Sequence, residues 1–363
     1  MANIKKIQAS LIRGGTSKGL FFSEHLPDQL LALALGSPDE TSMQLDGVGG
    51  GITSTSKIAI VTPRPGDLDV DYLFGQVDLS SGRVDWSGSC GNLAAAVGIY
   101  ARESGLVSPE KRTISVWQKN LGYQIDVTYP EEENQIAIPG VPRTSPSILV
   151  EFVRPKMSGL DLLPTGNPID KLLGIDVSLC CCGNPTVFVR ASDLLALLGR
   201  DEQEELLLPD AYSAKLADII DSLCSEGSAK MGIKHTDAIR LSWLRSPTNY
   251  RRRSGGGLVS AETVDIIGCI STPGRVHHAF TTTGMVNLAA MACIPGTIPY
   301  EIAGNTGTDG KCSVSLGQPA GVVKIQALCS KKECGEWYAE KVGLLRTART
   351  LMSGYVHVPL PSS

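Results

Sequence analysis

The sequence predicts an α/β protein of the α+β kind, made of two similar domains that each wrap a mostly antiparallel sheet around a central helix. A chain of 363 residues is long enough to bury two cores. Its 42% hydrophobic, 19% charged composition with 39 glycines is typical of a globular protein with many tight turns. Two alanine-rich apolar segments, each preceded by a turn of small residues, predict the two central helices.

The first half begins with the alternating run "IQASLI", the glycine-rich turn "RGGTSKG" (Arg13–Gly19) and the apolar run "LFF". This pattern predicts a strand, a turn and a second strand. Residues 67–86 and 113–129 each alternate around a turn, which indicates two hairpins. Between them a helix is expected from near Cys90 to Glu103, with Gly105 as its left-handed cap.

The second half repeats this order of parts, so we infer an internal duplication. Residues 176–189 predict a strand, a Gly-Asn-Pro turn and a strand, and residues 201–233 predict an exposed helical hairpin. A strand at 263–271 then leads through "HHAFTTTGM" into an apolar helix that ends at Ile294-Pro295-Gly296. The Pro- and Gly-rich stretch near residue 165 suggests domains 1–165 and 166–363, with a return of the last strand to the first domain as the alternative.

Composition and charge argue against several classes of partner. The net charge of −4 gives no electrostatic indication of nucleic-acid binding. The basic run Arg251–Arg253 is expected to be a solvated loop. We find no membrane-length apolar run and no signal-like N-terminus, so a cytoplasmic protein with ten reduced cysteines is expected. Both a monomer and a homodimer remain open.

Cys90 is the first candidate for chemistry. A buried structural thiol is the common fate of cysteine. A thiol at a helix N-terminus has its thiolate stabilised, however, and the small residues of "SGSCGN" leave little bulk over the sulfur. Local sequence alone leaves the two interpretations balanced.

Lys57 is the second candidate, because it ends the run "LDGVGGGITSTSK". A surface lysine at the start of a strand is the simple interpretation. A long Gly, Ser and Thr loop is costly in conformational entropy unless its amides are used, so it could wrap an anion that Lys57 binds or deprotonates. The run matches neither the dinucleotide fingerprint nor a P-loop, so no nucleotide is expected. The adjacent His277 and His278 lack zinc-site spacing, and no metal is expected.

Seven segments occur in the order typical of the PrpF family: "RGGTSKG", "DGVGGGITSTSK", "VDYLFGQV", "VDWSGSCGN", "PTGN", "GNPTVFV" and "HHAFTTTGM". The chain therefore resembles this family, which includes isomerases of 2-methylaconitate, aconitate, methylitaconate and oxalomesaconate. The resemblance implies a diaminopimelate-epimerase-like fold with a site between two domains. It assigns Lys57 and Cys90 as catalytic residues and requires no cofactor.

Further residues are expected to contact the substrate. They are Arg13, Thr16, Ser17, Lys18, Ser54, Thr55, Ser56, Gly91, Asn92, Arg275, His278, Thr282, Thr283 and Gln318. The chain departs from many family members where they carry Gly-His-Pro-Ser-Gly, because it has "GQPAG" with Gln318 and Ala320. This departure leaves the identity of the substrate open.

The expected function is a cofactor-independent isomerase that moves or inverts the double bond of an aconitate-type tricarboxylate, either aconitate or 2-methylaconitate. Tautomerisation of 4-oxalomesaconate and isomerisation of methylitaconate are alternatives, as is a non-catalytic tricarboxylate-binding accessory protein. A two-thiol racemase is disfavoured, because the turn that matches Cys90 in the second half is Thr281–Thr283.

Overall fold

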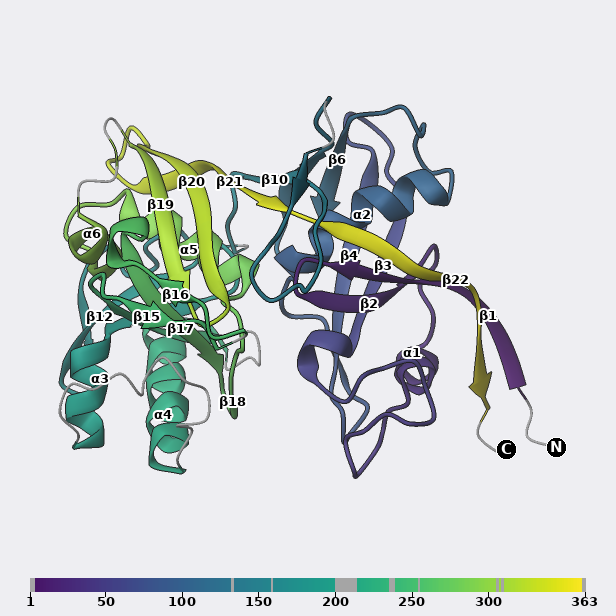
Figure 1. The fold of residues 1–363 in the computed structure, drawn as a ribbon, viewed down its shortest axis with the longest axis horizontal. Coiled ribbons are helices and arrows are strands. Elements are labelled where there is room, and N and C mark those ends of the chain that lie inside the picture. The colour runs from purple at the N-terminus through teal and green to yellow at the C-terminus, as the bar shows by residue number, and fades with distance from the viewer. Residues whose placement is uncertain are drawn as a thin grey trace. The chain divides into compact units, whose positions relative to one another are not determined.

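The computed structural model describes residues 4–131, 134–157, 159–199, 214–234, 239–253, 255–304, 307 and 310–360, without the side chain of residue 275. The chain forms two compact units (Figure 1), Met1–Val150 with Arg346–Ser363 and Glu151–Leu345. The expected boundary at 165 lies inside the second unit. Residues of that linker pack there: Met157 and Leu160 contact the second core, and the amide of Cys181 donates to the carbonyl of Leu162.

The first unit contains a mixed sheet in the order β22-β1-β2-β3-β4-β6-β7-β10, with β5 also paired to β4. The strand bounds are β1 Ile4–Gly14, β2 Ser17–Phe22, β3 Lys57–Pro63, β4 Val70–Val77, β5 Val84–Asp85, β6 Thr113–Gln118, β7 Tyr123–Thr128, β10 Ile148–Val153 and β22 Ala348–Pro359. A separate short pair joins β8 Gln135–Ile136 to β9 Ser145–Pro146. The predicted strand-turn-strand at the N-terminus and both predicted hairpins are therefore confirmed.

Two helices cover opposite faces of this sheet. Helix α2 (Gly91–Glu103) is buried along almost its whole length and packs against β1, β2 and β3, as its all-round apolar sequence predicts. Helix α1 (Asp28–Leu35) belongs to the core on the other face, with Ile7, Leu20 and Ile58. Because α2 starts at the predicted residue, Cys90 lies at its N-terminus.

The second unit has a sheet in the order β11-β12-β13-β14-β17-β19-β20-β21, with β18 paired to β17. Its strands are β11 Asp170–Leu172, β12 Ile175–Cys180, β13 Thr186–Arg190, β14 Arg240–Arg245, β17 Ile266–Thr272, β18 Arg275–Val276, β19 Lys311–Gln318, β20 Gly321–Lys331 and β21 Trp337–Arg346. The pair β15 Tyr250–Arg251 and β16 Leu258–Val259 stands apart. Two short 3-10 turns are η1 Thr53–Thr55 in the first unit and η4 Ala261–Thr263 in the second.

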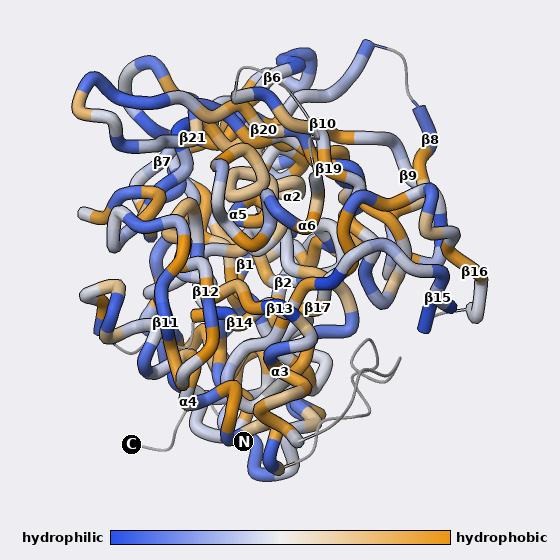
Figure 2. Tube along the Cα trace, turned by 90° about the vertical axis from the view of Figure 1, so that its left-hand side faces the viewer, coloured by the Kyte–Doolittle hydropathy of each residue, from blue (hydrophilic) through white to orange (hydrophobic). Residues whose placement is uncertain are grey.

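Four helices flank the second sheet. Helices α5 (Thr282–Ala292) and α6 (Ile298–Ala303) pack together, with α5 against β19 and β20. Helices α3 (Ala191–Leu198) and α4 (Ala214–Lys230) pack against β13 and β14 and share the second core. In Figure 2 the hydrophobic colour follows β13 and β17, the inner strands between these layers. Residues 201–213 of the predicted helical hairpin lie outside the described residues. The remainder forms α4, which buries one side rather than standing exposed.

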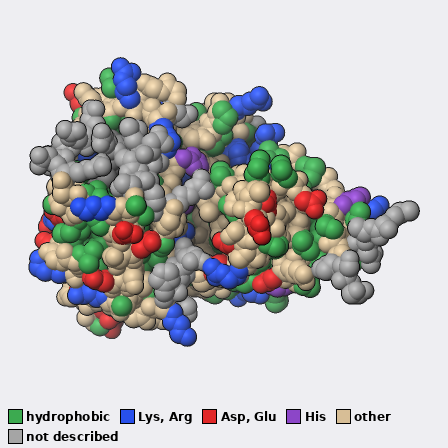
Figure 3. All heavy atoms as spheres, turned by 90° about the horizontal axis from the view of Figure 1, so that it is seen from below, with side chains coloured by type: hydrophobic (Ala, Val, Ile, Leu, Met, Phe, Trp, Pro, Cys, Tyr) green, Lys and Arg blue, Asp and Glu red, His purple; other side chains and the backbone are tan. Residues whose placement is uncertain are grey.

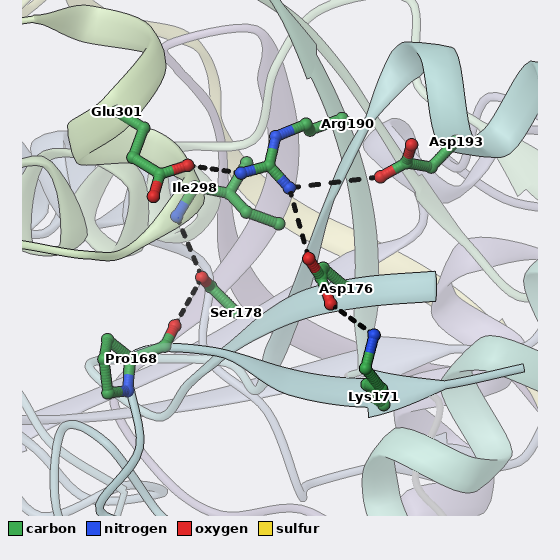
Figure 4. Close-up of polar contacts among 8 residues, drawn as sticks. All are labelled: Pro168, Lys171, Asp176, Ser178, Arg190, Asp193, Ile298 and Glu301. Atoms are coloured by element: carbon green, nitrogen blue, oxygen red, sulfur yellow. Dashed lines mark hydrogen bonds and ion pairs between the residues drawn. The ribbon is translucent and has the colours of Figure 1, made fainter. Parts of the chain in front are cut away.

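A polar network joins α6 to β12 and to Arg190 at the end of β13 (Figure 4). Arg190 pairs with Glu301 of α6, and its other guanidinium nitrogen lies 4.0 Å from Asp176 of β12. The hydroxyl of Ser178 on β12 accepts from the amide of Ile298 at 3.0 Å. Because α6 follows α5 after a short turn, these contacts hold the end of α5 on the sheet.

The two units repeat one pattern of strand pairing. From β1 to β7 the successive pairs are antiparallel, parallel, antiparallel, parallel and antiparallel, with α2 inserted before β6. From β12 to β20 the same five orientations recur, with α5 inserted before β19. This repetition agrees with the internal duplication inferred from the sequence.

The surface charges are mixed in sign. In Figure 3 basic and acidic side chains are interspersed among polar and hydrophobic ones on the visible face. Among the described residues, no helix has the length and apolar character needed to cross a membrane.

The buried cysteines give a test of the packing. All ten cysteines are free, and Cys334 is exposed. Burial raises the pKa of Cys181, Cys224 and Cys269 to about 12, so these thiols are almost entirely protonated at pH 8. We expect iodoacetamide at pH 8 to alkylate Cys334 quickly and these three slowly, as read by peptide mass mapping. Protein unfolded in guanidinium chloride is the control, in which all should react. Rapid native labelling of Cys224 or Cys269 would contradict the packing.

Candidate active site

Lys57 starts β3 on the face of the first sheet that carries α2. It is paired in register with Gly19 of β2 and Gln76 of β4. A Cβ atom added to Gly19 would approach Leu93 of α2 at 3.0 Å, so this row of residues faces the helix. The half-buried Lys57 donates from Nζ to Oε1 of Gln76 at 2.7 Å.

An aromatic ring lies beside the Lys57 amine. Nζ is 5.0 Å from the ring centroid of Phe74, which precedes Gln76 by two residues and so points to the same face. The side chain of Asn120 accepts from the Phe74 amide at 2.9 Å and donates to the Phe74 carbonyl at 2.8 Å. Asn120, expected only as a turn residue, therefore fixes the backbone under this ring.

Cys90 is the N-cap of α2, and its side chain makes no capping hydrogen bond. Ser, Thr, Asp or Asn at an N-cap would accept from the first free amides of the helix. Cys90 is 7% exposed. Its carbonyl accepts from the hydroxyl of Tyr72 at 3.2 Å, and Tyr72 is fully buried on β4. Burial raises the pKa of Tyr72 well above its ordinary value, so the phenol stays a donor.

The β1–β2 turn lies directly against the first turn of α2. A Cβ atom on Gly14 would come within 2.4 Å of the Asn92 carbonyl oxygen, and one on Gly15 within 2.2 Å of Asn92 Oδ1. Gly15 also has a φ of +52°. The side-chain amide of Asn92 donates to the Thr16 hydroxyl at 3.2 Å. The structure thus brings the expected residues Thr16, Gly91 and Asn92 to the N-terminus of α2, and Ser17 follows them as the first residue of β2.

The basic residues of this turn differ in their contacts. Arg13 donates through Nη1 to the carbonyls of Gly15 and Thr347 at 3.0 Å, and through Nη2 to the Ser145 hydroxyl at 3.3 Å. Through these bonds Arg13 holds the turn against Thr347, the residue before β22, and against Ser145 of β9. The half-buried Lys18 is paired with Arg13 across the hairpin.

The glycine-rich loop before Lys57 does not present the open amides that the sequence led us to expect. The amides of Gly50 and Gly51 donate to Oε1 of Gln44 at 3.0 and 3.1 Å, and the amide of Gly49 donates to the Leu35 carbonyl. The Ser56 hydroxyl donates to the same Gln44 oxygen at 2.7 Å. The loop therefore wraps the buried side chain of Gln44 rather than an anion.

The hydroxyls of Thr55 and Ser54 in this loop do not bond to Gln44. Thr55 donates to the Ile52 carbonyl at 3.0 Å. The half-buried Ser54 makes no side-chain hydrogen bond within the part of the chain that the structure describes. Of the three expected loop contacts, Ser54 is the one whose hydroxyl is available to a ligand.

In the second unit the helix that matches α2 is capped. Thr281 is the N-cap of α5, and its hydroxyl accepts from the Gly284 amide at 3.2 Å. Thr282 and Thr283 begin the helix and are buried. His278 is exposed, and the side chain of residue 275 lies outside the described atoms.

Gln318 lies at the end of β19 and is buried. Its Oε1 accepts from the amides of Phe280 at 3.0 Å and Ala320 at 3.3 Å. Its carbonyl accepts from the Tyr250 hydroxyl. Gln318 therefore fixes the segment that enters α5, a structural task that the sequence did not suggest.

Three residues of the first unit were missed by sequence reasoning: Gln76, Tyr72 and Gln44. Gln76 and Tyr72 lie within "VDYLFGQV", which counts toward the family resemblance and is predicted as a strand, but no residue in it is assigned to the site from the sequence. Only the register, which places Gln76 opposite Lys57, reveals their position. Gln44 has no signal beyond its place before the glycine run.

Comparison with known proteins shows the family to which the chain belongs. The family model "PrpF protein" matches residues 4–359. The chain is 35% identical to a 2-methyl-aconitate isomerase of Shewanella oneidensis, with 98% of each chain covered. It is 31% identical to a 4-oxalomesaconate tautomerase of Pseudomonas putida, over 97% of this chain and 96% of that protein.

Solved structures give the fold. A methylitaconate-delta-isomerase superposes with a TM-score of 0.75 at 29% identity, over 98% of this chain and 96% of that one. A hydroxyproline epimerase from Agrobacterium vitis superposes with a TM-score of 0.55 at 14% identity, covering 99% and 95%. The fold is diaminopimelate-epimerase-like, and the protein is an isomerase. The chain belongs to the PrpF family.

The Tyr72 contact can be tested on stability. We expect Tyr72→Phe to lower the free energy of unfolding by about 0.5–1.5 kcal/mol, because the Cys90 carbonyl loses one of its two donors and keeps only the Ala94 amide. Urea denaturation at constant m-value measures the change. Tyr355→Phe is the matched control, since Tyr355 is 63% exposed. Equal stability of the two variants would show that the contact contributes nothing.

Proposed function

We propose that this isomerase shifts the double bond of an aconitate-type tricarboxylate, or inverts it from cis to trans, with aconitate or 2-methylaconitate as substrate. The observation that carries the proposal is the placement of Lys57 and Cys90 in the first unit. Both lie on the α2 side of one sheet, and alternate residues of β4 connect them. Gln76 and Phe74 contact the Lys57 amine, and the Tyr72 hydroxyl donates to the Cys90 carbonyl.

In this proposal Lys57 removes a proton from the carbon next to the double bond. The electron pair of the broken C–H bond delocalises over the double bond into the neighbouring carboxylate. Return of the proton to the far carbon moves the double bond, whereas rotation in the anion before return to the same carbon gives the cis–trans product. Lys57 must be neutral to act as the base, and Cys90 supplies a thiol beside the path of the proton.

The N-terminus of α2 suits a substrate with several carboxylates. The helix has thirteen residues, no acidic residue in its first turn and no side-chain cap from Cys90. Its first amides and the positive end of its dipole therefore favour an anion there. Preorganised positive potential of this kind stabilises the negative charge that develops in the transition state. Thr16, Lys18, Ser54 and Asn92 are proposed as further contacts, and the second unit's expected residues are retained as proposals.

The alternative substrates use the same proton chemistry. Similarity to a methylitaconate-delta-isomerase of TM-score 0.75 favours methylitaconate, and similarity to a 4-oxalomesaconate tautomerase favours that substrate. Proton NMR in D2O with each candidate offered separately distinguishes them. Deuterium at the far carbon reports a shift of the double bond, whereas deuterium at the original carbon together with the opposite double-bond geometry reports rotation.

Lys57→Ala tests the base. We expect substrate-dependent deuterium exchange to fall by at least about 10²-fold, because no other group replaces a positioned general base. Cys90→Ser should retain measurable exchange if the thiol assists rather than initiates the transfer. Lys5→Ala, on an exposed position of β1, is the matched control and should exchange at the wild-type rate. Undiminished exchange in Lys57→Ala would overturn the assignment.

A further inference from the structure

Gln76 is held in one orientation by the backbone of the loop before β3. Its Nε2 donates to the carbonyl of Ser56 at 2.9 Å and to that of Thr53 at 3.2 Å. A third, longer contact joins Nε2 to the carbonyl of Val77 at 3.4 Å, so backbone carbonyls use both hydrogens of the amide nitrogen. Rotating the amide by half a turn would put Oε1 against two carbonyl oxygens, which repel it. The oxygen must therefore point away from the loop.

That oxygen is the one that accepts from Lys57 Nζ at 2.7 Å. An ammonium and a neutral amine both have N–H groups, so the bond can persist in either protonation state of Lys57. It does not use the lone pair of the neutral amine, because the amine is the donor. The contact thus fixes the nitrogen in space and leaves its basicity intact.

The acceptor is also uncharged. A carboxylate at the same distance would stabilise the ammonium and oppose loss of its proton. We propose that Gln76 is a positioning residue for Lys57, an orientationally locked acceptor that holds the amine through an uncharged oxygen. The proposal rests on the function proposed above, in which Lys57 must be neutral to take a proton.

Titratable residues also occur on the described elements next to β3. Lys18 belongs to β2, Tyr72 to β4, Asp85 to β5 and Cys90 to the entry of α2. Asp85 is paired with Gln76 on the far side from Lys57. Gln76→Glu also loses the bonds to the loop carbonyls, so Gln76→Met, which loses the same bonds without adding a charge, is the reference for the effect of charge at residue 76.

The first measurement is direct and needs no substrate. Competitive acetylation over a range of pH, read by peptide mass spectrometry, gives the pKa of the Lys57 amine in the folded protein. We expect Gln76→Glu to raise this pKa by about 1–3 pH units, the effect of an opposite charge within about 4–6 Å. Gln8→Glu places the same charge on an exposed residue of β1 and should leave the pKa of Lys57 unchanged. An unchanged pKa in folded Gln76→Glu overturns the proposal.

The second measurement uses activity. In Gln76→Glu the acidic limb of the profile of kcat/KM against pH should move to higher pH by the same amount as the amine. Gln76→Met keeps the length of the side chain but removes the acceptor. It should lower kcat by about 10²-fold, the effect of a misplaced reacting group, and change KM little. Wild-type kcat in Gln76→Met overturns the proposal even where Gln76→Glu does not fold.

The two measurements separate this inference from the proposed function. If Lys57→Ala keeps full exchange, Lys57 is not the base and the proposed function fails, whatever Gln76 does to the amine. If Lys57→Ala loses exchange while Gln76→Glu leaves the amine pKa and the pH profile unchanged, Lys57 is still the base. The positioning role of Gln76 is then wrong.

Discussion

The β1–β2 turn approaches the first turn of α2 so closely that no side chain fits between them. A Cβ atom at Gly14 would lie 2.4 Å from a backbone oxygen, which cannot move aside as a side chain would. Glycine at 14 and 15 allows the helix to begin against the sheet. The position of Cys90, and that of the helix dipole relative to Lys57, depend on this contact. Arg13 reinforces it, because its guanidinium joins the turn to Thr347, the residue before β22.

The duplicated architecture supports unequal chemistry in its two halves. Cys90 leaves the first amides of α2 without a side-chain cap, whereas Thr281 caps α5 through its hydroxyl. The residue that starts β14 in the register of Lys57 is Arg240, paired with Thr186 as Lys57 is with Gly19. A guanidinium stays protonated in proteins and cannot serve as a base. The same scaffold thus presents a lysine and an uncapped cysteine in the first unit where the second has an arginine and a capping threonine.

Local patterns predicted most of the fold, because each depends on neighbours in sequence. The turn of small residues before "NLAAAVGIYA" placed the start of α2, and alternation placed the hairpins. The sequence suggested that the glycine-rich loop could bind an anion through its free amides. The amides of Gly50 and Gly51 instead donate to the side chain of Gln44, a tertiary contact that local sequence does not reveal. Gln76 escaped notice because its significance comes from the strand opposite it.

Two uncharged groups contact the amine of Lys57 at the start of β3. Its contacts with Gln76 and Phe74 are a carbonyl-type oxygen and a ring face, both uncharged. Each attracts the ammonium more weakly than a carboxylate would, so proton loss is opposed less. Both partners are themselves fixed by hydrogen bonds to backbone atoms, Gln76 through its own amide and Phe74 through Asn120. Gln76 and Phe74 are therefore held in place beside the Lys57 amine, and neither adds a charge of its own.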